Sequence, residues 1–467
     1  MEKWIDPFTP ALEIADSVRT GASSARAVVE AALARIGEID AGLNAYTVVL
    51  AQRALAQADE VDGRVASGED LRLAGVPLAV KDHVWLAGAP ATNGSRALAD
   101  FVPDVDCVAV SRLTDAGAVV VGKTNNPEFC YRGDTDSPLW GLTRNPWDRD
   151  RTPGGSSGGS GVAVATGMAA LAIGTDGGGS IRIPAAFCGI VGHKPTHGLV
   201  PARPGFRGWP SLSVHGPMAR TVPDVAAMLA VMAGPHPADP SVVPLPLVSH
   251  EAATGGRRDL DGLRVAVSAD FGFAQLQPEV RRAFEAAAAT FAELGCELVD
   301  AHPVTEDPVP LWMTIAHAEG FASEGHLLDR EDLIDPDTAR TVRRGETISS
   351  REYLDAQERR MQLCSTWAAF LEDFDFILSP GGQLLPFLAG EADPSDPGGE
   401  YPADHWWGMD AIANLTGQPV TAVPWDLTES GLPVGVQLMA RRFGDAQLLA
   451  AAGIWEAGAR RLWSHPS

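Results

Sequence analysis

The sequence predicts an α/β fold in which strands and helices alternate in layers. Between about Gly75 and Pro201, short apolar runs are separated by glycine-rich turns, and the runs read VPLAV (76–80), AVVVG (118–122) and MAALAIG (168–174). Short β-branched strands that alternate with helices are typical of layered α/β proteins. The chain has 467 residues, so it can bury a large core as one big domain or as two to three smaller ones.

Helical spacing dominates the first 65 or so residues. Ser23 or Ser24 can cap the start of one helix. Apolar residues follow at the spacing of a single helix face: Val28, Val29, Ala32, Leu33, Ile36 and Ile39.

The second half of the chain continues the alternation. The Pro-rich stretch 234–250 predicts a surface connection between two halves of the fold. Residues 381–408 are rich in Gly, Pro and Asp and end in His405, Trp406 and Trp407, which predicts a long loop of the kind that forms a lid or a pocket wall. The other expected elements are strands at 263–268, 297–300, 374–380, 420–425 and 432–439, a helix at 278–295, a long helical region at about 311–374, and a last helix through about Arg460.

Charge and cysteine content exclude several classes of protein. The net charge of −24 at pH 7 repels phosphate backbones and anionic lipid, so we expect neither nucleic acid nor membrane as a partner. No apolar run is long enough to cross a bilayer, and the N-terminus MEKWIDPFTP lacks the features of a secretory signal, so we expect a cytoplasmic protein. An odd number of widely spaced cysteines without a CxxC pair argues against a disulfide framework and a structural zinc site. The cysteines are Cys107, Cys130, Cys188, Cys296 and Cys364.

Lysine is rare in this chain. Only Lys3, Lys81, Lys123 and Lys194 occur, and unlike arginine a lysine can lose its proton when it is buried. Lys81 ends the apolar run VPLAVK and precedes Asp82. Two interpretations stay open from composition alone: a surface lysine paired with Asp82, or a desolvated lysine whose lowered pKa lets it act as a base.

Two clusters of glycine and serine are the sharpest feature of the sequence. The first, RTPGGSSGGSG (151–161), has the composition of a flexible linker, but it lies between a turn at Asn145-Pro146-Trp147 and an apolar run. The second cluster ends at Ser180, one helix and one strand later. Two clusters at that spacing can converge at one end of a sheet, where α/β proteins place their ligands.

Other motif matches do not survive inspection of their context. The G-x-S-x-G match at 154–158 follows NPWDRDRTP, which is not the strand that a nucleophile elbow needs. The Walker A match at 117–124 has β-branched residues in its middle and Asn125-Asn126-Pro127 after it, so we interpret Lys123 as structural. Neither S-x-x-K nor HExxH occurs in the chain.

At these motifs the sequence resembles the amidase signature hydrolases. The resemblance implies a single α/β domain over 1–467, with a central, mixed, twisted sheet covered by helices on both faces. Its parts would be N-terminal helices (1–70), a signature core (75–201), a surface connection (234–260) and a C-terminal half that completes the sheet (261–467). The resemblance runs through GVPLAVKD (75–82), GAVVVGKTN (117–125), GLTRNPW (141–147), PGGSSGGSG (153–161), GTDGGGSIRIPAAFCGIVGHKPT (174–196), NLTGQPVTAVP (414–424) and GLPVGVQLM (431–439).

The resemblance implies a Ser–cis-Ser–Lys triad. Lys81 would be the base, Ser156 the bridging serine in a cis peptide after Gly155, and Ser180 the nucleophile. Neutral Lys81 would take the proton of Ser156 while Ser156 takes that of Ser180, which attacks the carbonyl and forms an acyl-enzyme. This mechanism requires no metal and no organic cofactor.

Supporting roles follow from the same resemblance. Backbone N–H groups of Gly177, Gly178, Gly179 and Ser180 would form the oxyanion hole. Gly155, Ser157, Asp176 and Arg182 would support the site, with a plausible Asp–Arg pair.

Three positions depart from the usual pattern of the family. Gly177 stands where a larger residue is common, which we expect to loosen the oxyanion loop. His193 replaces an apolar residue and is interpreted as a packed core histidine, and Trp425-Asp426 replace a small residue. None of these departures touches the triad.

The resemblance implies a small-molecule amide as substrate. The resemblance places Cys130 and Tyr131 at the wall of the acyl pocket, and Phe387, Trp406 and Trp407 are further candidates from the long loop. Aromatic walls favour an aryl or bulky apolar acyl group. The resemblance is closer to broad-substrate bacterial amidases than to the alternative, a glutaminase subunit of a tRNA-dependent amidotransferase. Two further functions stay open: an esterase that uses the same triad, and a catalytically silent scaffold. We also expect that the protein can form a homodimer.

Overall fold

The computed structural model describes residues 6–244, 259–391, 406–459 and 465–466. The β-strands are β1 (Tyr46–Val49), β2 (Pro77–Lys81), β3 (Val119–Thr124), β4 (Asp136–Ser137), β5 (Gly141–Leu142), β6 (Leu171–Asp176), β7 (Val191–Lys194), β8 (Val214–Ala219), β9 (Arg264–Val267), β10 (Glu297–Asp300), β11 (Phe376–Pro380), β12 (Val420–Leu427) and β13 (Pro433–Met439). The α-helices are α1 (Ala11–Arg19), α2 (Ala25–Ile39), α3 (Ala51–Ala66), α4 (Val108–Asp115), α5 (Gly158–Ala165), α6 (Arg182–Cys188), α7 (Val222–Met232), α9 (Pro278–Glu293), α10 (Val309–Glu324), α11 (Pro336–Glu346), α12 (Ser350–Phe370), α13 (Gly408–Thr416) and α14 (Asp445–Ala459). Short 3₁₀ helices are η1 (Asp40–Gly42), η2 (Arg96–Leu98), η3 (Glu128–Cys130) and η4 (Gly325–Leu333).

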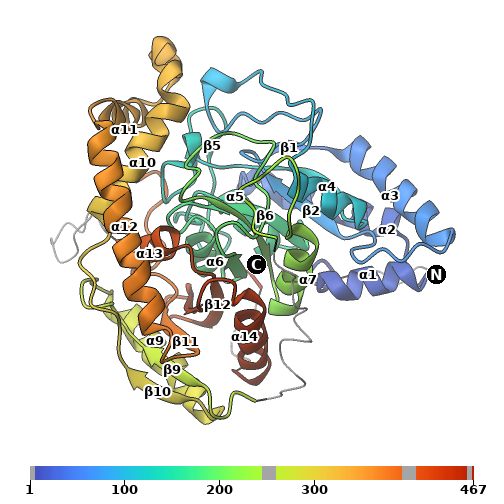
Figure 1. The fold of residues 1–467 in the computed structure, drawn as a ribbon. Coiled ribbons are helices and arrows are strands. Elements are labelled where there is room, and N and C mark those ends of the chain that lie inside the picture. Colours follow the sequence, from blue (N-terminus) through green and yellow to red (C-terminus); the bar gives the residue numbers. More distant parts are fainter. Residues whose placement is uncertain (1–5, 245–258, 392–405, 460–464, 467) are drawn as a thin grey trace.

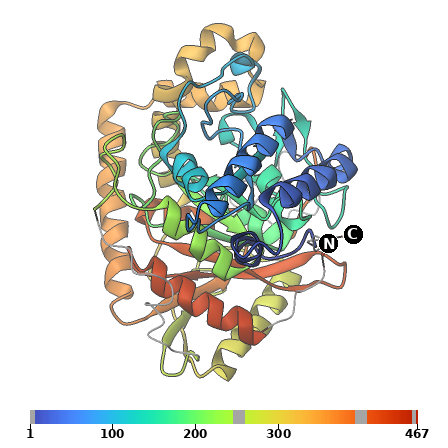
Figure 2. The same ribbon diagram turned by 90° about the vertical axis from the view of Figure 1, so that its right-hand side faces the viewer.

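A single mixed sheet forms the centre of the molecule (Figure 1). Its eleven strands have the order β1-β3-β2-β6-β8-β7-β12-β13-β11-β9-β10. Four neighbouring pairs are parallel and six are antiparallel. The sheet is twisted and helices cover both of its faces (Figure 2), so the predicted fold class is confirmed. One hydrophobic cluster of buried side chains extends from Ala11 in α1 to Trp455 in α14.

The N-terminal segment differs from the sequence prediction at one place. The first 65 residues were expected to be helical, but Tyr46–Val49 forms β1, which pairs antiparallel with β3. The segment YTVV is aromatic and β-branched, and such residues fit a half-buried strand better than a helix. Gly122 in β3 permits the close approach, because a Cβ there would lie 2.5 Å from the carbonyl oxygen of Val48.

The long helical region predicted at 311–374 is divided into α10, η4, α11 and α12. Local capping explains the breaks. The Asp335 side chain accepts hydrogen bonds from the backbone N–H groups of Asp337 and Thr338 and thereby starts α11. Ser349 and Glu352 form a capping box that starts α12. These helices form the layer at the left of Figure 1.

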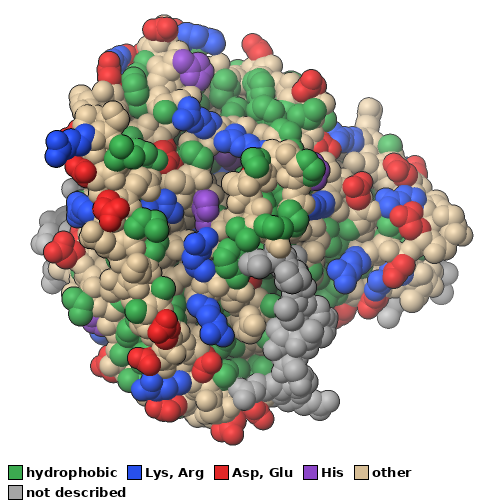
Figure 3. Space-filling view, in the orientation of Figure 1, with side chains coloured by type: hydrophobic (Ala, Val, Ile, Leu, Met, Phe, Trp, Pro, Cys, Tyr) green, Lys and Arg blue, Asp and Glu red, His purple; other side chains and the backbone are tan. Residues whose placement is uncertain are grey.

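Some expectations fall outside the described residues. They concern 245–258 of the Pro-rich connection, 392–405 of the long loop with His405, and Arg460 at the end of the last helix. Among the helices that the structure describes, none has the length and hydropathy that a membrane crossing requires. Figure 3 shows acidic, basic and hydrophobic side chains interspersed on one face of the molecule.

Candidate active site

The candidate site lies where the carboxyl ends of two parallel strands meet. Strands β2 and β6 are parallel neighbours, so Lys81 at the end of β2 and Thr175 and Asp176 at the end of β6 share one edge of the sheet. The two glycine-serine clusters converge there, since the backbone N–H of Ser157 donates to the carbonyl oxygen of Ser180 at 3.1 Å. The predicted convergence is therefore confirmed.

Lys81 is buried and is bound by hydroxyl groups. Its Nζ lies 2.7 Å from Ser156 Oγ, 3.0 Å from Ser157 Oγ and 2.8 Å from Thr175 Oγ1. The side chain has no exposed surface, and burial lowers the pKa of Lys81 because it penalises the charged amine. The sequence analysis did not identify Thr175.

The alternative of a surface lysine paired with Asp82 is wrong. Lys81 is fully buried, and the Asp82 carboxylate instead accepts a hydrogen bond from Thr92 Oγ1 at 3.0 Å. That carboxylate also accepts the backbone N–H of Gly94 at 3.2 Å. Lys81 is therefore available to the serines.

The Gly155–Ser156 peptide bond is cis, as expected. No side chain fits at Gly155, since a Cβ there would lie 2.1 Å from the carbonyl oxygen of Asp134. Ser157 braces the neighbouring strand: its Oγ accepts the backbone N–H of Thr175 at 3.2 Å. This arrangement directs the Ser156 hydroxyl to Lys81.

The expected oxyanion hole is corrected at one residue. The backbone N–H of Gly179 donates to Asp176 Oδ1 at 2.8 Å and is therefore not available to an oxyanion. Within the described part of the chain, the N–H groups of Gly177, Gly178 and Ser180 have no hydrogen-bond partner. Three of the four expected donors thus remain.

Asp176 and Arg182 form the expected ion pair, and both side chains are fully buried. Arg182 Nε and Nη2 each lie 3.0 Å from the Asp176 carboxylate. Burial alone would raise the pKa of Asp176, but the guanidinium of Arg182 holds it well below its usual range. The pair fixes the loop that carries Ser180, because Asp176 also accepts the backbone N–H groups of Gly179 and Ile181.

Three residues that the sequence analysis missed extend this network. Arg182 donates to Asp410 Oδ1 at 2.9 Å and to Asn414 Oδ1 at 2.7 Å. Gln437 Nε2 donates to Asp410 Oδ1 at 2.8 Å, and burial raises the pKa of Asp410 to about 6. Asn414 and Gln437 are polar residues inside apolar motifs of the sequence. Because a buried polar group needs a hydrogen-bond partner, their positions could have indicated a buried polar network.

Two further residues that were missed, Trp209 and Trp312, pack against Gly177. A Cβ on Gly177 would lie 2.7 Å from Trp209 Cε3. Trp312 Nε1 donates to the carbonyl oxygen of Gly177 at 2.7 Å. The expectation that Gly177 loosens the oxyanion loop is therefore wrong, because the indole of Trp209 fills the space that a side chain would take.

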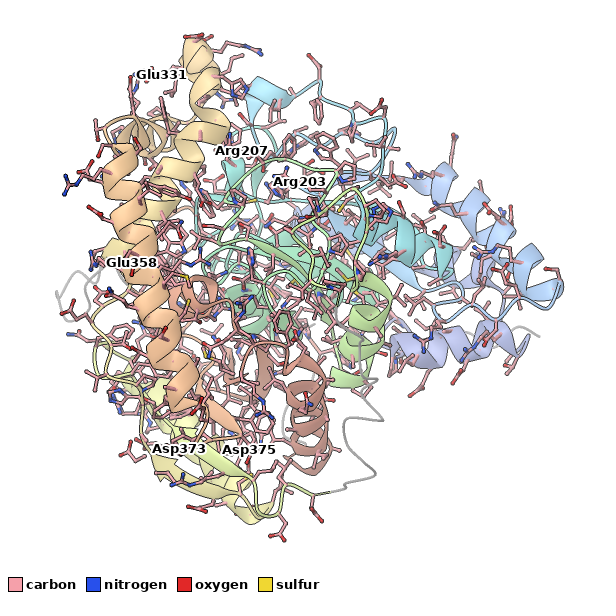
Figure 4. All side chains as sticks on the ribbon, viewed as in Figure 1. Arg203, Arg207, Glu331, Glu358, Asp373 and Asp375 are labelled. Carbon is pink, nitrogen blue, oxygen red and sulfur yellow. The ribbon has the colours of Figure 1, made fainter. Side chains whose placement is uncertain are left out.

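Ser180 lies where two cavities meet. The larger has a volume of about 620 Å³ and is lined by Ser156 and by the connection between β7 and β8. Arg203 and Arg207 lie on that connection (Figure 4). The smaller has a volume of about 170 Å³ and is lined by residues of α10 and α11, by Gly178 and by three tryptophans.

The predicted pocket residues divide into two groups. Cys130 and Tyr131 line both cavities and Trp407 lines the smaller one. Phe387 and Trp406 line neither of these two cavities, so their place at the substrate pocket stays a prediction. They pack on each other at 5.4 Å between ring centroids and on Phe187 of α6, because the loop buries its aromatic side chains against that helix.

The thiol of Cys130 lies in strongly perturbing surroundings. Burial would raise the pKa of this thiol, but the neighbouring Lys81 amine and the hydrogen bonds of His83 and Ser156, which stabilise a thiolate, lower it to about 6. Cys130 and the preceding Phe129 both have positive φ angles, 65° and 49°. The thiol is thereby held at the wall of both cavities.

Two residues that were interpreted as structural are confirmed in that role. Lys123 Nζ donates to the backbone carbonyl oxygens of Asp82, Val84 and Pro90 at 3.0, 2.7 and 3.2 Å. His193 is buried and lies within hydrogen-bond distance of Thr421 and Asp445. Among the described residues, no group of three or more His, Cys, Asp or Glu side chains is placed to hold a metal ion.

Comparisons with known proteins point to one family. The family model described as Amidase matches residues 27–449. A glutamyl-tRNA(Gln) amidotransferase subunit of Synechococcus sp. (strain RCC307) is 36% identical, with 97% of each chain covered. An acylamidase of Rhodococcus erythropolis is also 36% identical and covers 96% of this chain and 94% of the relative. Sequence identity therefore does not separate the amidotransferase protein from the acylamidase.

A solved structure agrees in fold. It is that of a bacterial aryl acylamidase that belongs to the amidase signature enzymes. The two chains superpose with a TM-score of 0.89 at 29% sequence identity, and the match covers 97% of this chain and 96% of the other.

Proposed function

Because the chain belongs to the amidase signature family and is an amide-hydrolysing enzyme, we propose that Ser180, Ser156 and Lys81 are its catalytic triad. The observation that carries the proposal is the buried contact of 2.7 Å between Lys81 Nζ and Ser156 Oγ. Burial lowers the pKa of Lys81, which favours the neutral amine that a base requires. The backbone contact between Ser157 and Ser180 keeps the nucleophile beside this pair.

Acylation begins when neutral Lys81 takes the proton of Ser156 and Ser156 takes the proton of Ser180. Ser180 Oγ then forms a bond to the amide carbonyl carbon. As the tetrahedral intermediate collapses, the C–N bond breaks and the relay runs backwards, so that the proton passes from Lys81 through Ser156 to the departing nitrogen. Water adds to the acyl-enzyme by the same relay and releases the carboxylate product.

The charge that develops on the carbonyl oxygen needs donors fixed in advance. The N–H groups of Gly177, Gly178 and Ser180 fit this role, because none has another partner among the described residues. Loss of one such donor typically costs about 10²–10³-fold in kcat. The buried Asp176–Arg182 pair supports the role, since it fixes the loop from which these N–H groups project.

The aromatic wall supports an aryl or bulky apolar acyl group as substrate. Trp209, Trp312 and Trp407 line the smaller cavity. Two of the similar proteins are an acylamidase and an aryl acylamidase. The alternative substrate, glutamine, carries an α-ammonium that needs a carboxylate. No Asp or Glu side chain is among the described residues that line the smaller cavity.

The test of the triad is active-site labelling with a fluorophosphonate, read by intact mass. The wild type should form a single adduct that vanishes in Ser180→Ala and forms much more slowly in Lys81→Ala. Labelling that persists without Ser180 would show that the triad does not operate. Hydrolysis of a benzoyl ester beside benzamide measures how far the enzyme is also an esterase. Strong preference for glutamine, or co-purification with a second protein chain, would favour the amidotransferase alternative.

We also propose that the whole chain is a single domain, because one sheet joins strands from Tyr46 to Met439. The homodimer and the cytoplasmic location expected from the sequence stay predictions. Size-exclusion chromatography with light scattering measures the first.

A further inference from the structure

The two cavities that meet at Ser180 differ in their access to the proton relay. Ser156 lines the larger cavity. The smaller cavity is lined by Gly155, the residue before Ser156, and not by Ser156 itself. Thr175, which also binds Lys81, lines the larger cavity. Two of the three hydroxyl groups that contact Lys81 therefore line the larger cavity, and none of the three lines the smaller one.

This asymmetry assigns the two halves of an amide substrate. The relay must return its proton to the departing nitrogen, so the amine has to lie on the same side as Ser156. The water that later attacks the acyl-enzyme needs the same relay and enters where the amine has left. The larger cavity therefore takes the amine, and the smaller cavity takes the acyl group.

The size and lining of the smaller cavity fit an aromatic ring. Its volume is about 170 Å³, and an apolar cavity of roughly 150 Å³ accommodates benzene. Trp209 and Trp312 lie against the oxyanion loop, and Met313 adds further apolar surface to the cavity wall. A flat acyl group such as benzoyl fits this space, whereas a larger acyl group has to extend out between α10 and α11.

The end of the smaller cavity between α10 and α11 is cationic. Arg344 of α11 lines it and is exposed, and within the described residues its guanidinium has no ion pair and no hydrogen bond. Arg132 also lines the cavity, but it faces the carboxylates of Asp335 and Asp337 at 3.6 and 3.5 Å. Arg344 is therefore the cation at this wall that has no carboxylate partner of its own among the described residues.

A second polar group at the same end has no partner. Nε2 of His317, on α10, is buried and makes no hydrogen bond in the structure. Burial and the nearby charge of Arg344 lower the pKa of His317 to about 4, so the ring is neutral at pH 7 and can donate from Nε2. A buried polar atom without a partner needs an explanation, and a bound group that accepts a hydrogen bond from Nε2 would supply the partner.

We propose that the smaller cavity binds an aromatic acyl group that carries an acidic substituent opposite its carboxamide, and that Arg344 and His317 bind this substituent. A carboxylate fits both groups, because it accepts from a guanidinium and from an imidazole N–H. This assignment rests on the proposed triad, which decides the side of the amine. Arg344 and His317 are then specificity-determining residues and have no part in the bond-breaking step.

The test compares benzamide with 4-carboxybenzamide as substrates. In Arg344→Met, the ratio of kcat/KM for 4-carboxybenzamide to kcat/KM for benzamide should fall by roughly three- to tenfold, the range for a partly exposed charge pair. His317→Phe keeps an aromatic ring, removes Nε2 and should lower the same ratio. High salt should lower the ratio of the wild type, since an exposed pair is screened.

Arg343→Met is the matched control. It removes one positive charge from the adjacent position of α11, but Arg343 pairs with Glu331 and is not among the residues that line the cavity. Glu331 lies at the upper end of the helical layer (Figure 4). The ratio should stay within twofold of the wild type in this variant. An equal fall in Arg343→Met would show a general charge effect and overturn the proposal.

A further variant separates the assignment of the cavities from the role of Arg344. Met313→Trp narrows the smaller cavity and should slow deacylation of the benzoyl-enzyme far more than that of the acetyl-enzyme. If the acyl group lay in the larger cavity, both rates would change alike and the assignment would be wrong. Failure of the proposed function gives another pattern, because then Ser180 is not labelled and neither amide is hydrolysed.

Discussion

Two buried lysines on adjacent parallel strands have opposite surroundings. Lys81 ends β2 and Lys123 lies near the end of β3, and neither side chain has exposed surface. Lys123 donates to three backbone carbonyl oxygens, whereas Lys81 binds three hydroxyl groups. Both amines are buried beside the ends of neighbouring strands, but one is surrounded by hydroxyl groups and the other by carbonyl oxygens.

The difference teaches what makes a buried lysine useful as a base. A carbonyl oxygen only accepts, so the neighbours of Lys123 can neither take a proton from it nor return one to it. A hydroxyl donates as well as accepts, so Lys81 can lose a proton and then receive one from Ser156. Burial lowers the pKa of both amines, that of Lys123 to about 8, and therefore does not by itself distinguish a base from a structural cation.

Replacing Lys81 should have the largest effect on rate. Lys81→Met should lower kcat/KM by roughly 10²–10⁴-fold, because the relay loses its proton acceptor. The three hydroxyls can pair with one another or with water, so the melting temperature should change little. Steady-state kinetics with a benzamide substrate and thermal unfolding measure the two quantities. Unchanged kinetics would remove Lys81 from the mechanism.

Replacing Lys123 should have the opposite effects: a large loss of stability and a small loss of rate. Lys123→Met leaves three buried carbonyl oxygens without their donor, and the free energy of unfolding should fall by about 3 kcal/mol or more. Activity per folded molecule should fall far less than in Lys81→Met. Urea unfolding followed by circular dichroism, beside kinetics on the folded fraction, tests this. A fully stable Lys123→Met protein that lacks activity would contradict the comparison.

The pH dependence of stability should follow from the lowered pKa of Lys123. Between about pH 8 and 10.5 the unfolded chain binds a proton that the folded protein has lost, so this residue makes the free energy of unfolding rise with pH across that window. Below pH 8 both states are protonated and the contribution is constant. Lys123→Met should abolish this rise, which unfolding titrations from pH 7 to 10.5 detect.

The smallest expected effect concerns the acid limb of the rate profile. kcat/KM should fall as the pH drops through the lowered pKa of Lys81, because the protonated amine cannot accept a proton. The Cys130 thiolate favours the charged form of Lys81, so Cys130→Ala should move this limb to lower pH by under about one unit. Profiles of kcat/KM against pH compare the two proteins. A shift to higher pH would mean that the thiol is not ionised beside Lys81.

The sequence was sufficient to single out residues whose placement depends on local order. Lys81, Ser156 and Ser180 stand in motifs with fixed spacing, and the parallel pairing of β2 and β6 brings their ends together. Lys123 and His193 were also interpreted correctly, because an apolar strand on both sides predicts burial. The Asp176–Arg182 pair is six residues apart on one loop and helix start, so it too is a local feature.

Other residues depended on contacts between distant parts of the chain. Trp209 reaches Gly177 from the connection between β7 and β8, and Trp312 reaches it from α10. Phe387 and Trp406 were expected at the pocket, but in the structure their rings pack on Phe187. Composition alone cannot decide which partner an aromatic ring buries its surface against, because apolar burial is non-directional.

By itself, the sequence determined the alternation of strands and helices, the order of the serine clusters and the place of Lys81 at the end of a strand. Periodicity, capping and strand spacing depend on residues that are close in sequence, so they can be recognised from the sequence alone. Only the tertiary structure decided that Ser180 lines two cavities, that Asp410 and Gln437 support Arg182, and that Arg344 lines the smaller cavity. These features arise where side chains distant in sequence compete for the same space and the same hydrogen bonds, and close packing settles that competition.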